Sequence, residues 1–200
     1  MAQNSVVAIA GGTCSGKTTL AIALQEAIGV NRSCSLSMDS YYIYPNPSMV
    51  NSDDYNFDHP NALDLGLFND DLTSLIAGKS IYSPIYDRRL HKSVGSKLCA
   101  PAQITIVEGL FVLWDENVRN HTTLGIFIDT DADIRLGRRM IRDSIEYGLD
   151  LQQVITNYVD VARPMHNQFI EPTKQHADLV LRWPTSIQEE VSLVLEILGY

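Results

Sequence analysis

The chain has 200 residues, 45% of them hydrophobic and 20% charged, with 15 lysines and arginines against 24 aspartates and glutamates. This composition is typical of a folded globular protein, and the length predicts a single domain over residues 1–200. The formal net charge of −9 argues against broad binding to nucleic acid or to an anionic membrane. No uncharged apolar run approaches the ~18–20 residues that cross a bilayer, so we expect no membrane partner.

Apolar runs alternate with helical patterns along the chain. The patterns predict strands at residues 5–10, 33–37, 104–107, 125–128 and 179–181, and helices at 18–28, 131–147 and 186–198. This alternation predicts an α/β fold with three layers, a mostly five-stranded parallel sheet with helices on both faces. Such sheets bind ligands beyond the carboxyl ends of their strands, so the residues that follow each strand are the candidate site.

A glycine-rich loop follows the first predicted strand and opens the first helix. It fits the pattern G-x-x-x-x-G-K-[ST], in which backbone N–H groups and the helix N-terminus surround a phosphate. Lys17 is expected to contact the β- and γ-phosphates of a nucleotide, and the Thr18 hydroxyl to bind Mg²⁺. The predicted nucleotide-binding residues are Gly11, Gly12, Thr13, Cys14, Ser15, Gly16, Lys17, Thr18 and Thr19.

Carboxylates follow three other predicted strands. Asp39 can accept a proton from an acceptor alcohol or reach Mg²⁺, and Glu108 suits a direct or indirect role at Mg²⁺. Asp129 is expected to cap the next helix. Without the phosphate loop, helix capping or a solvated loop would be the better interpretation of Asp39 and Glu108.

The predicted helix at residues 131–147 has four arginines within about a 100° arc, at positions 135, 138, 139 and 142. A cationic face in so acidic a chain favours a lid, at about residues 131–150, that closes over phosphates. Acidic residues four positions from Arg135, Arg139 and Arg142 support the alternative, a surface helix with ordinary ion pairs. The segment at about residues 40–61 is rich in tyrosine, proline and aspartate, and we interpret it as a substrate-facing loop.

The three cysteines, Cys14, Cys34 and Cys99, are odd in number and show no C-x-x-C spacing. We therefore expect a reducing, cytoplasmic compartment, with neither a disulfide framework nor a structural zinc. The first residues lack a cationic leader, so no secretory signal is expected.

These features together resemble the uridine kinase (uridine–cytidine kinase) family of P-loop kinases, within the phosphoribulokinase/uridine kinase group. Beyond the phosphate loop, the similar segments are residues 39–42, 56–60, 84–87, 108–110, 127–133, 138–143 and 163–174. The resemblance implies transfer of the γ-phosphate of ATP (or GTP) to the 5′-hydroxyl of a pyrimidine ribonucleoside, with Mg²⁺. It also implies a homo-oligomer.

The resemblance also implies roles for individual residues. Asp39 would be the general base with Tyr42 beside it, Asp58 would hold the ribose hydroxyls, and Tyr86 and His91 would contact the pyrimidine. On the lid, Arg139 would help at the ribose and Arg142 at the phosphates, while Thr18 and Glu108 would lie around Mg²⁺.

The chain departs from the family pattern mainly in the lid. Tyr147 and Leu149 replace two arginines, and Asn157 replaces a glutamine that touches the ribose. Two alternatives therefore stay open. One is a kinase for another small alcohol, such as nicotinamide riboside or ribulose 5-phosphate, for which Arg32, Arg88 and Arg89 are the nearby cations. The other is a kinase-like protein that binds nucleotide with little turnover.

Overall fold

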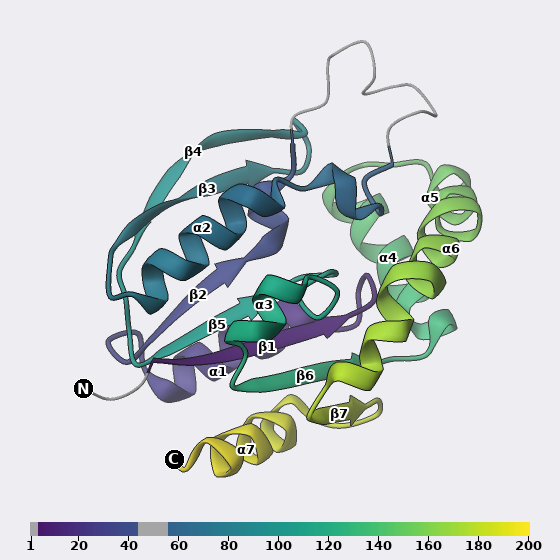
Figure 1. Ribbon diagram of the computed structural model, residues 1–200. Helices are drawn as coiled ribbons and strands as arrows, with labels where there is room; N and C mark the ends of the chain where they lie inside the picture. Colours follow the sequence, from purple (N-terminus) through teal and green to yellow (C-terminus); the bar gives the residue numbers. More distant parts are fainter. Residues whose placement is uncertain (1–3, 44–55) are drawn as a thin grey trace.

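The computed structural model describes residues 4–43 and 56–200, and its centre is a five-stranded parallel sheet (Figure 1). The strand order is β2-β5-β1-β6-β7. The strands are β1 (Ser5–Gly11), β2 (Ser33–Ser37), β5 (Ile104–Glu108), β6 (Leu124–Asp129) and β7 (Leu179–Arg182). All five coincide within two residues with the strands predicted from the sequence, which confirms the predicted α/β sheet.

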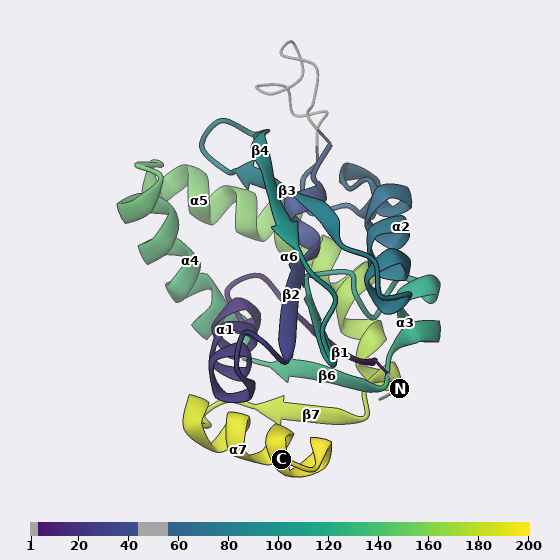
Figure 2. The same cartoon turned by 90° about the vertical axis from the view of Figure 1, so that its left-hand side faces the viewer.

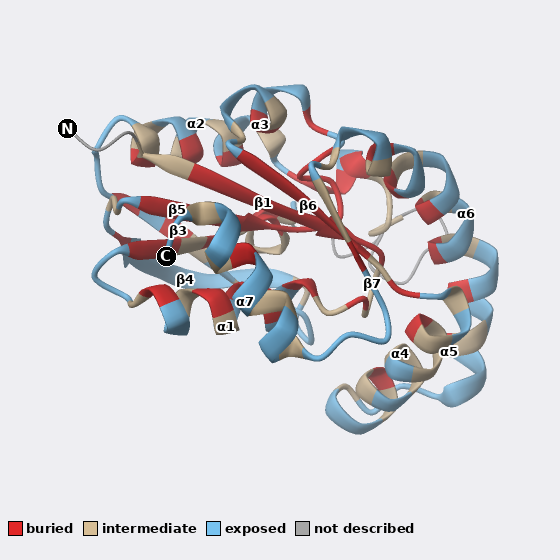
Figure 3. Ribbon diagram, turned by 90° about the horizontal axis from the view of Figure 1, so that it is seen from below, coloured by how far each residue is buried: buried red, intermediate tan, exposed pale blue. Residues whose placement is uncertain are grey.

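Helices cover both faces of the sheet because the strands are apolar on both sides (Figure 3). Val7 and Ile9 of β1 pack with α1 (Lys17–Ile28) and α7 (Ile187–Leu198). Val6, Ala8 and Ala10 of the same strand face a second cluster, formed mainly with α2 (Leu65–Ile76) and α3 (Glu116–His121). This gives the predicted three layers.

All three predicted helices are present with nearly the expected bounds. The helix predicted at residues 18–28 is α1, which ends at Gly29 in a positive-φ conformation. The arginine-rich helix is α4 (Ala132–Glu146), which begins after β6. The closing helix, α7, begins with a capping box between Ser186 and Glu189.

A two-stranded antiparallel hairpin lies outside the main sheet. Its strands are β3 (Ile81–Asp87) and β4 (Lys92–Cys99), and β4 is exposed over all but its last residue. Figure 2 shows the hairpin between α2 on one side and α4 and α5 (Leu151–Asn157) on the other. Its tip, residues 88–91, is therefore at the same end of the molecule as the carboxyl ends of the strands.

The remaining described elements are short. A run of helical turns leads from α4 back to β7, and two turns flank the segment interpreted as a substrate loop. These elements are η1 (Met38–Tyr41), η2 (Pro60–Ala62), α5 (Leu151–Asn157), η3 (Tyr158–Ala162), α6 (Arg163–Met165), η4 (His166–Ile170) and η5 (Glu171–His176). Residues 44–55 of the predicted substrate loop lie outside the described residues. Among the described residues, no helix is both long enough and apolar enough to span a membrane.

Candidate functional site

The phosphate loop follows β1 and ends where α1 begins, as the sequence predicts. Gly11, Cys14 and Gly16 have φ values of 148°, 56° and 114°, which turn the backbone around a central point. A Cβ at Gly11 would lie 2.7 Å from the carbonyl oxygen of Ile128, so only glycine fits there. The loop therefore has the curved backbone and helix N-terminus that a phosphate group needs.

The phosphate loop forms one end of a cavity of about 960 Å³. Seven of the nine predicted nucleotide-binding residues line it, namely Thr13, Cys14, Ser15, Gly16, Lys17, Thr18 and Thr19. Gly11 and Gly12 do not line this cavity, and Gly12 instead faces a smaller one behind the loop. The size of the main cavity suits a nucleotide together with a small second substrate.

Lys17 lies inside the loop with only 7% of its surface exposed. Its Nζ donates to the carbonyl oxygen of Gly12 at 2.8 Å. Burial lowers the pKa of Lys17, while the nearby carboxylates of Glu108 and Asp39 oppose that shift.

Glu108 ends β5 beside the phosphate loop, as predicted. Its carboxylate accepts from Ser37 at 2.5 Å and from the Thr18 hydroxyl at 3.4 Å. Burial raises the pKa of Glu108, and the negative charge of Asp39 adds to the effect. Carboxylate and hydroxyl oxygens are hard ligands of the kind that Mg²⁺ prefers, so this group fits the predicted metal site.

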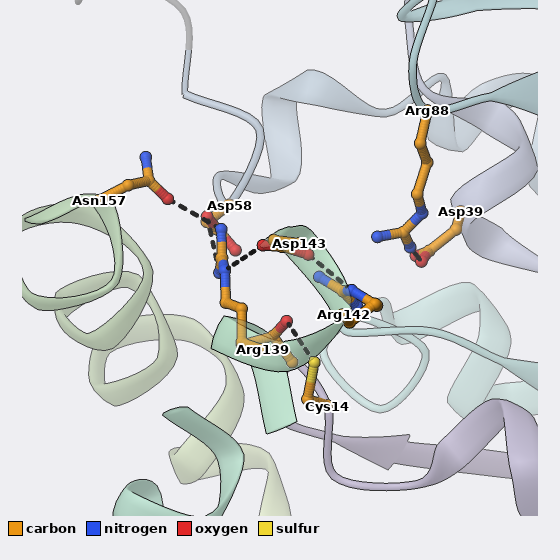
Figure 4. A network of polar contacts seen from close by, with 9 residues as sticks. Cys14, Asp39, Asp58, Arg88, Arg139, Arg142, Asp143 and Asn157 are labelled. Atoms are coloured by element: carbon orange, nitrogen blue, oxygen red, sulfur yellow. Dashed lines mark hydrogen bonds and ion pairs between the residues drawn. The ribbon is translucent and has the colours of Figure 1, made fainter. Parts of the chain in front are cut away.

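Asp39 lies in the η1 turn after β2 and faces the same cavity. The guanidinium of Arg88, at the tip of the β3–β4 hairpin, forms an ion pair with its carboxylate (Figure 4). The sequence had indicated Arg88 only as one of three cations near the substrate loop. Nothing in the sequence pattern predicts that it reaches Asp39.

Three of the four arginines of α4 face the cavity. Arg138 donates to the carbonyl oxygens of Cys14 and Ser15, each at 3.3 Å. Arg139 and Arg142 both donate to Asp143, at 3.2 and 2.7 Å (Figure 4). The helix therefore presents a cationic face to the phosphate loop. Of the three i,i+4 ion pairs that the sequence suggests for this helix, only the one between Arg139 and Asp143 forms among the described residues.

Two expectations for this region are wrong. Arg135 does not face the main cavity, because its side chain turns beneath Gly12 and donates from Nε to the carbonyl oxygen of Thr130. Asp129 does not cap α4. It ends β6, where its carboxylate accepts from Lys174 at 3.0 Å, and Asp131 occupies the N-cap position. Asp39 and Glu108 therefore converge on the cavity without Asp129.

The other end of the cavity is aromatic. Tyr42, Phe57, Tyr86 and His91 lie in contact there, with Tyr42 5.3 Å from Tyr86 and His91 stacked 4.8 Å from Phe57, between ring centroids. Burial lowers the pKa of His91, which favours the neutral imidazole, although the charge of Asp87 opposes the shift. Such a cluster can hold a flat ring by stacking.

Asp58 lies between the aromatic cluster and α4. Its carboxylate is 3.9 Å from Nη1 of Arg139, whose Nη2 also donates to Asn157 at 2.8 Å (Figure 4). Burial raises the pKa of Asp58, and the charge of Arg139 opposes the shift. The residues predicted to hold a sugar are therefore together in the structure.

Comparison with known proteins agrees with this arrangement. Residues 6–187 match the Phosphoribulokinase / Uridine kinase family. The chain belongs to this family. A uridine kinase from Clostridium perfringens is 39% identical over 199 residues, covering 96% of each chain. A uridine kinase from Halalkalibacterium halodurans is 40% identical over 196 residues, covering 96% of this chain and 91% of the relative.

Solved structures show the same fold. The phosphoribulokinase from Rhodobacter spheroides aligns with a TM-score of 0.68 at 12% identity, over 91% of this chain and 71% of that one. A possible uridine kinase from Bacillus stearothermophilus aligns with a TM-score of 0.65 at 17% identity, over 90% of both chains. Membership of this family of kinases makes the chain a phosphotransferase.

Proposed function

We propose that this protein transfers the γ-phosphate of ATP (or GTP) to the 5′-hydroxyl of a pyrimidine ribonucleoside, converting uridine or cytidine to its 5′-monophosphate. The observation that carries the proposal is the shape of the main cavity. Lys17 of the phosphate loop, the aromatic residues Tyr86 and His91, and Asp39 all line it. The charge of Asp39 acts on both Lys17 and Tyr42, so the carboxylate is close to both groups of residues. A phosphate donor and a ring-bearing acceptor would meet at that carboxylate.

The donor end binds anions through backbone groups and side chains. The phosphate loop and Lys17 would hold the β- and γ-phosphates, while Arg142 would approach them from α4. Thr18 and Glu108 would hold Mg²⁺, which supplies charge neutralisation between the phosphates when it is bound. These residues fit the nucleotide because their donors and oxygens line the same cavity.

The acceptor end recognises a nucleoside by two kinds of contact. Tyr86 and His91 would stack on the pyrimidine and bind its polar edge, with Tyr42 beside them. Asp58 would accept hydrogen bonds from the ribose 2′- and 3′-hydroxyls, and Arg139 would approach the same sugar. A sugar held at Asp58 would direct its 5′-hydroxyl toward the loop.

Asp39 would act as the general base. The nucleoside O5′ forms a bond to the γ-phosphorus, and the bond from that phosphorus to the β–γ bridging oxygen breaks, so that ADP leaves. The proton of O5′ passes to the Asp39 carboxylate. The free energy of activation falls because the reactants are held in line and the developing charge meets fixed cations.

A phosphorylated acceptor such as ribulose 5-phosphate is the second candidate. Arg88 and Arg89 both line the cavity, and together they would bind a second anionic group. Arg32 does not contribute, because it donates to the carbonyl oxygen of Ile28 and lies over the ring of Tyr200. The aromatic cluster and Asp58 favour the nucleoside.

A coupled ADP-release assay with ATP·Mg²⁺ tests the proposal. The acceptors are uridine, cytidine, adenosine, nicotinamide riboside and ribulose 5-phosphate, and Asp39→Asn serves as the blank. Turnover confined to uridine and cytidine is expected. Turnover only on another acceptor would contradict the proposed substrate. If ATP binds but none of the five acceptors causes ADP release, the proposed reaction is wrong.

Three further properties belong to the same proposal. We place the protein in the cytoplasm, where it would act in pyrimidine salvage, and we expect a homo-oligomer built from single-domain chains. The odd number of cysteines, without C-x-x-C spacing, supports a reducing compartment. Light scattering on the purified chain would measure the number of subunits.

A further inference from the structure

Two adjacent arginines at the tip of the β3–β4 hairpin contact other parts of the chain around the main cavity. Arg88 pairs with Asp39 after β2, and Nη2 of Arg89 donates to the carbonyl oxygen of Glu146 at the end of α4, at 2.6 Å. Figure 4 shows the Arg88 side chain extending from the hairpin to Asp39, across the site from Arg142. The hairpin thus places a cation beside Asp39 in the lining of the cavity.

The electrostatic surroundings of Arg88 include groups from both ends of the site. Burial dominates the raised pKa values of Glu108 and Asp58, and the charge of Arg88 opposes the shift in both. Burial also lowers the pKa of Lys17, and Arg88 adds to that effect. Arg88 is therefore close enough to act on the phosphate-binding end, the metal-binding carboxylate and the sugar-binding carboxylate.

The other cations of the site have partners that the proposed reaction does not change. Arg139 and Arg142 share Asp143, and Arg138 donates to carbonyl oxygens of the phosphate loop. Arg88 differs, because the carboxylate that pairs with it is the proposed proton acceptor. Its side chain is 41% exposed, so packing does not enclose all of it.

The reaction itself would move the charge that holds Arg88. When O5′ gives its proton to Asp39, the carboxylate becomes neutral and its attraction for the guanidinium is lost. In the same step, negative charge is spread over the equatorial oxygens of the phosphoryl group, which is being bonded to that same O5′. A guanidinium beside Asp39 is then next to the new anion and has two donors for it.

We propose that Arg88 is a catalytic residue, which pairs with Asp39 before phosphoryl transfer and donates to the transferred phosphoryl group during and after the reaction. The inference rests on the proposed function. It also means that Arg88 contributes to binding of the phosphorylated product but little to binding of the nucleoside.

The first test measures binding without ATP or Mg²⁺. Calorimetry compares the affinities for uridine and for uridine 5′-monophosphate in the wild type, Arg88→Ala and Arg88→Lys. The matched control is Lys92→Ala, which removes a positive charge from an exposed position on the same hairpin. We expect Arg88→Ala to weaken monophosphate binding about tenfold and to leave uridine binding unchanged. Arg88→Lys should retain part of the monophosphate affinity that the alanine variant loses, and the control should bind both ligands like the wild type.

The second test separates kcat from KM. Arg88→Ala is expected to lower kcat by roughly 10³-fold, the lower range for an arginine that stabilises a transferring phosphoryl group, with the uridine KM nearly unchanged. An unchanged or raised kcat would overturn the inference, as would equal losses of uridine and monophosphate affinity. Thermal unfolding at the wild-type temperature establishes that the variant is folded. If the wild type phosphorylates no nucleoside, the proposed function has failed; a fully active Arg88→Ala removes only the role of Arg88.

Discussion

Lys17 and Gly12 are joined by a hydrogen bond from the ammonium group to the carbonyl oxygen, 2.8 Å long, within the phosphate loop. This bond fixes the position of the Lys17 side chain within the loop, and the residue is 7% exposed. Burial lowers the pKa of this ammonium, so an anion that enters the loop would stabilise its charge. We therefore expect this lysine to bind phosphate strongly.

Replacing Lys17 with alanine should therefore weaken ATP binding by about 100-fold or more, since a buried charge-assisted contact to phosphate is lost. Calorimetry with ATP measures the change. Lys79→Ala, which removes an exposed lysine after α2, is the control and should bind ATP like the wild type. Full ATP affinity in Lys17→Ala would remove the phosphate-loop assignment.

Replacing Asp39 with asparagine should preserve nucleotide binding and lower kcat by ~10²–10⁴, the usual contribution of a positioned general base. Asparagine keeps the size of the side chain but accepts no proton, and it also leaves Arg88 without a charged partner. Initial rates with uridine and a separate ATP titration give the two quantities. Wild-type turnover in this variant would show that another group takes the proton.

Two glycine-to-alanine substitutions should have opposite effects on stability. A Cβ at Gly109 would lie 2.6 Å from Met38 Cβ, which cannot rotate away, so Gly109→Ala should lower the free energy of unfolding by about 1–3 kcal/mol. Gly137 lies inside α4 with no atom within 4 Å of its Cβ position. Gly137→Ala should therefore raise the free energy of unfolding by about 0.5–1 kcal/mol, and urea unfolding of both variants measures the difference.

His166 should make the fold less stable in mild acid. Burial, together with Arg135 and Lys17, lowers its pKa from 6.5 to about 4, although Glu171 opposes the shift. Between these values the unfolded chain binds a proton that the folded chain does not. Stability due to this residue is therefore complete above pH ~6.5 and falls by about 3 kcal/mol as the pH drops toward 4.

Urea unfolding between pH 4 and 7 measures this dependence. His166→Gln keeps a polar group near Glu171 and should flatten the curve. His121→Gln, at an exposed histidine of α3, is the control and should keep the wild-type slope. Equal slopes for His166→Gln and the wild type would mean that other groups cause the loss of stability.

The parallel sheet is predictable from sequence because its strands have continuous apolar runs. β1 is buried from Val6 to Gly11. A continuous apolar run of this length is typical of a strand inside a parallel sheet, where both faces are covered. The phosphate loop is predictable from its own sequence pattern, because its glycines and Lys17 follow directly after that strand. Local patterns determine these elements.

The β3–β4 hairpin has no such pattern. Pro84 interrupts β3, and β4 is exposed at seven of its eight positions, so neither strand shows apolar alternation. The ion pair between Arg88 and Asp39 joins residues 49 positions apart and depends on where the hairpin folds. The direction of the Arg135 side chain could not be predicted either. The helical spacing of the arginines gives the face of α4 on which Arg135 lies, but it does not show that the side chain packs beneath Gly12.

The hairpin has a further consequence for how this protein can change. Tyr86, Arg88 and His91 all come from one segment between α2 and β5 that shares no ladder hydrogen bond with the main sheet. The strand that leads into the phosphate loop lies at the centre of that sheet. Mutations, or even exchange of the whole segment with that of a relative, should therefore alter the proposed acceptor preference while the main sheet and the phosphate loop keep their structure.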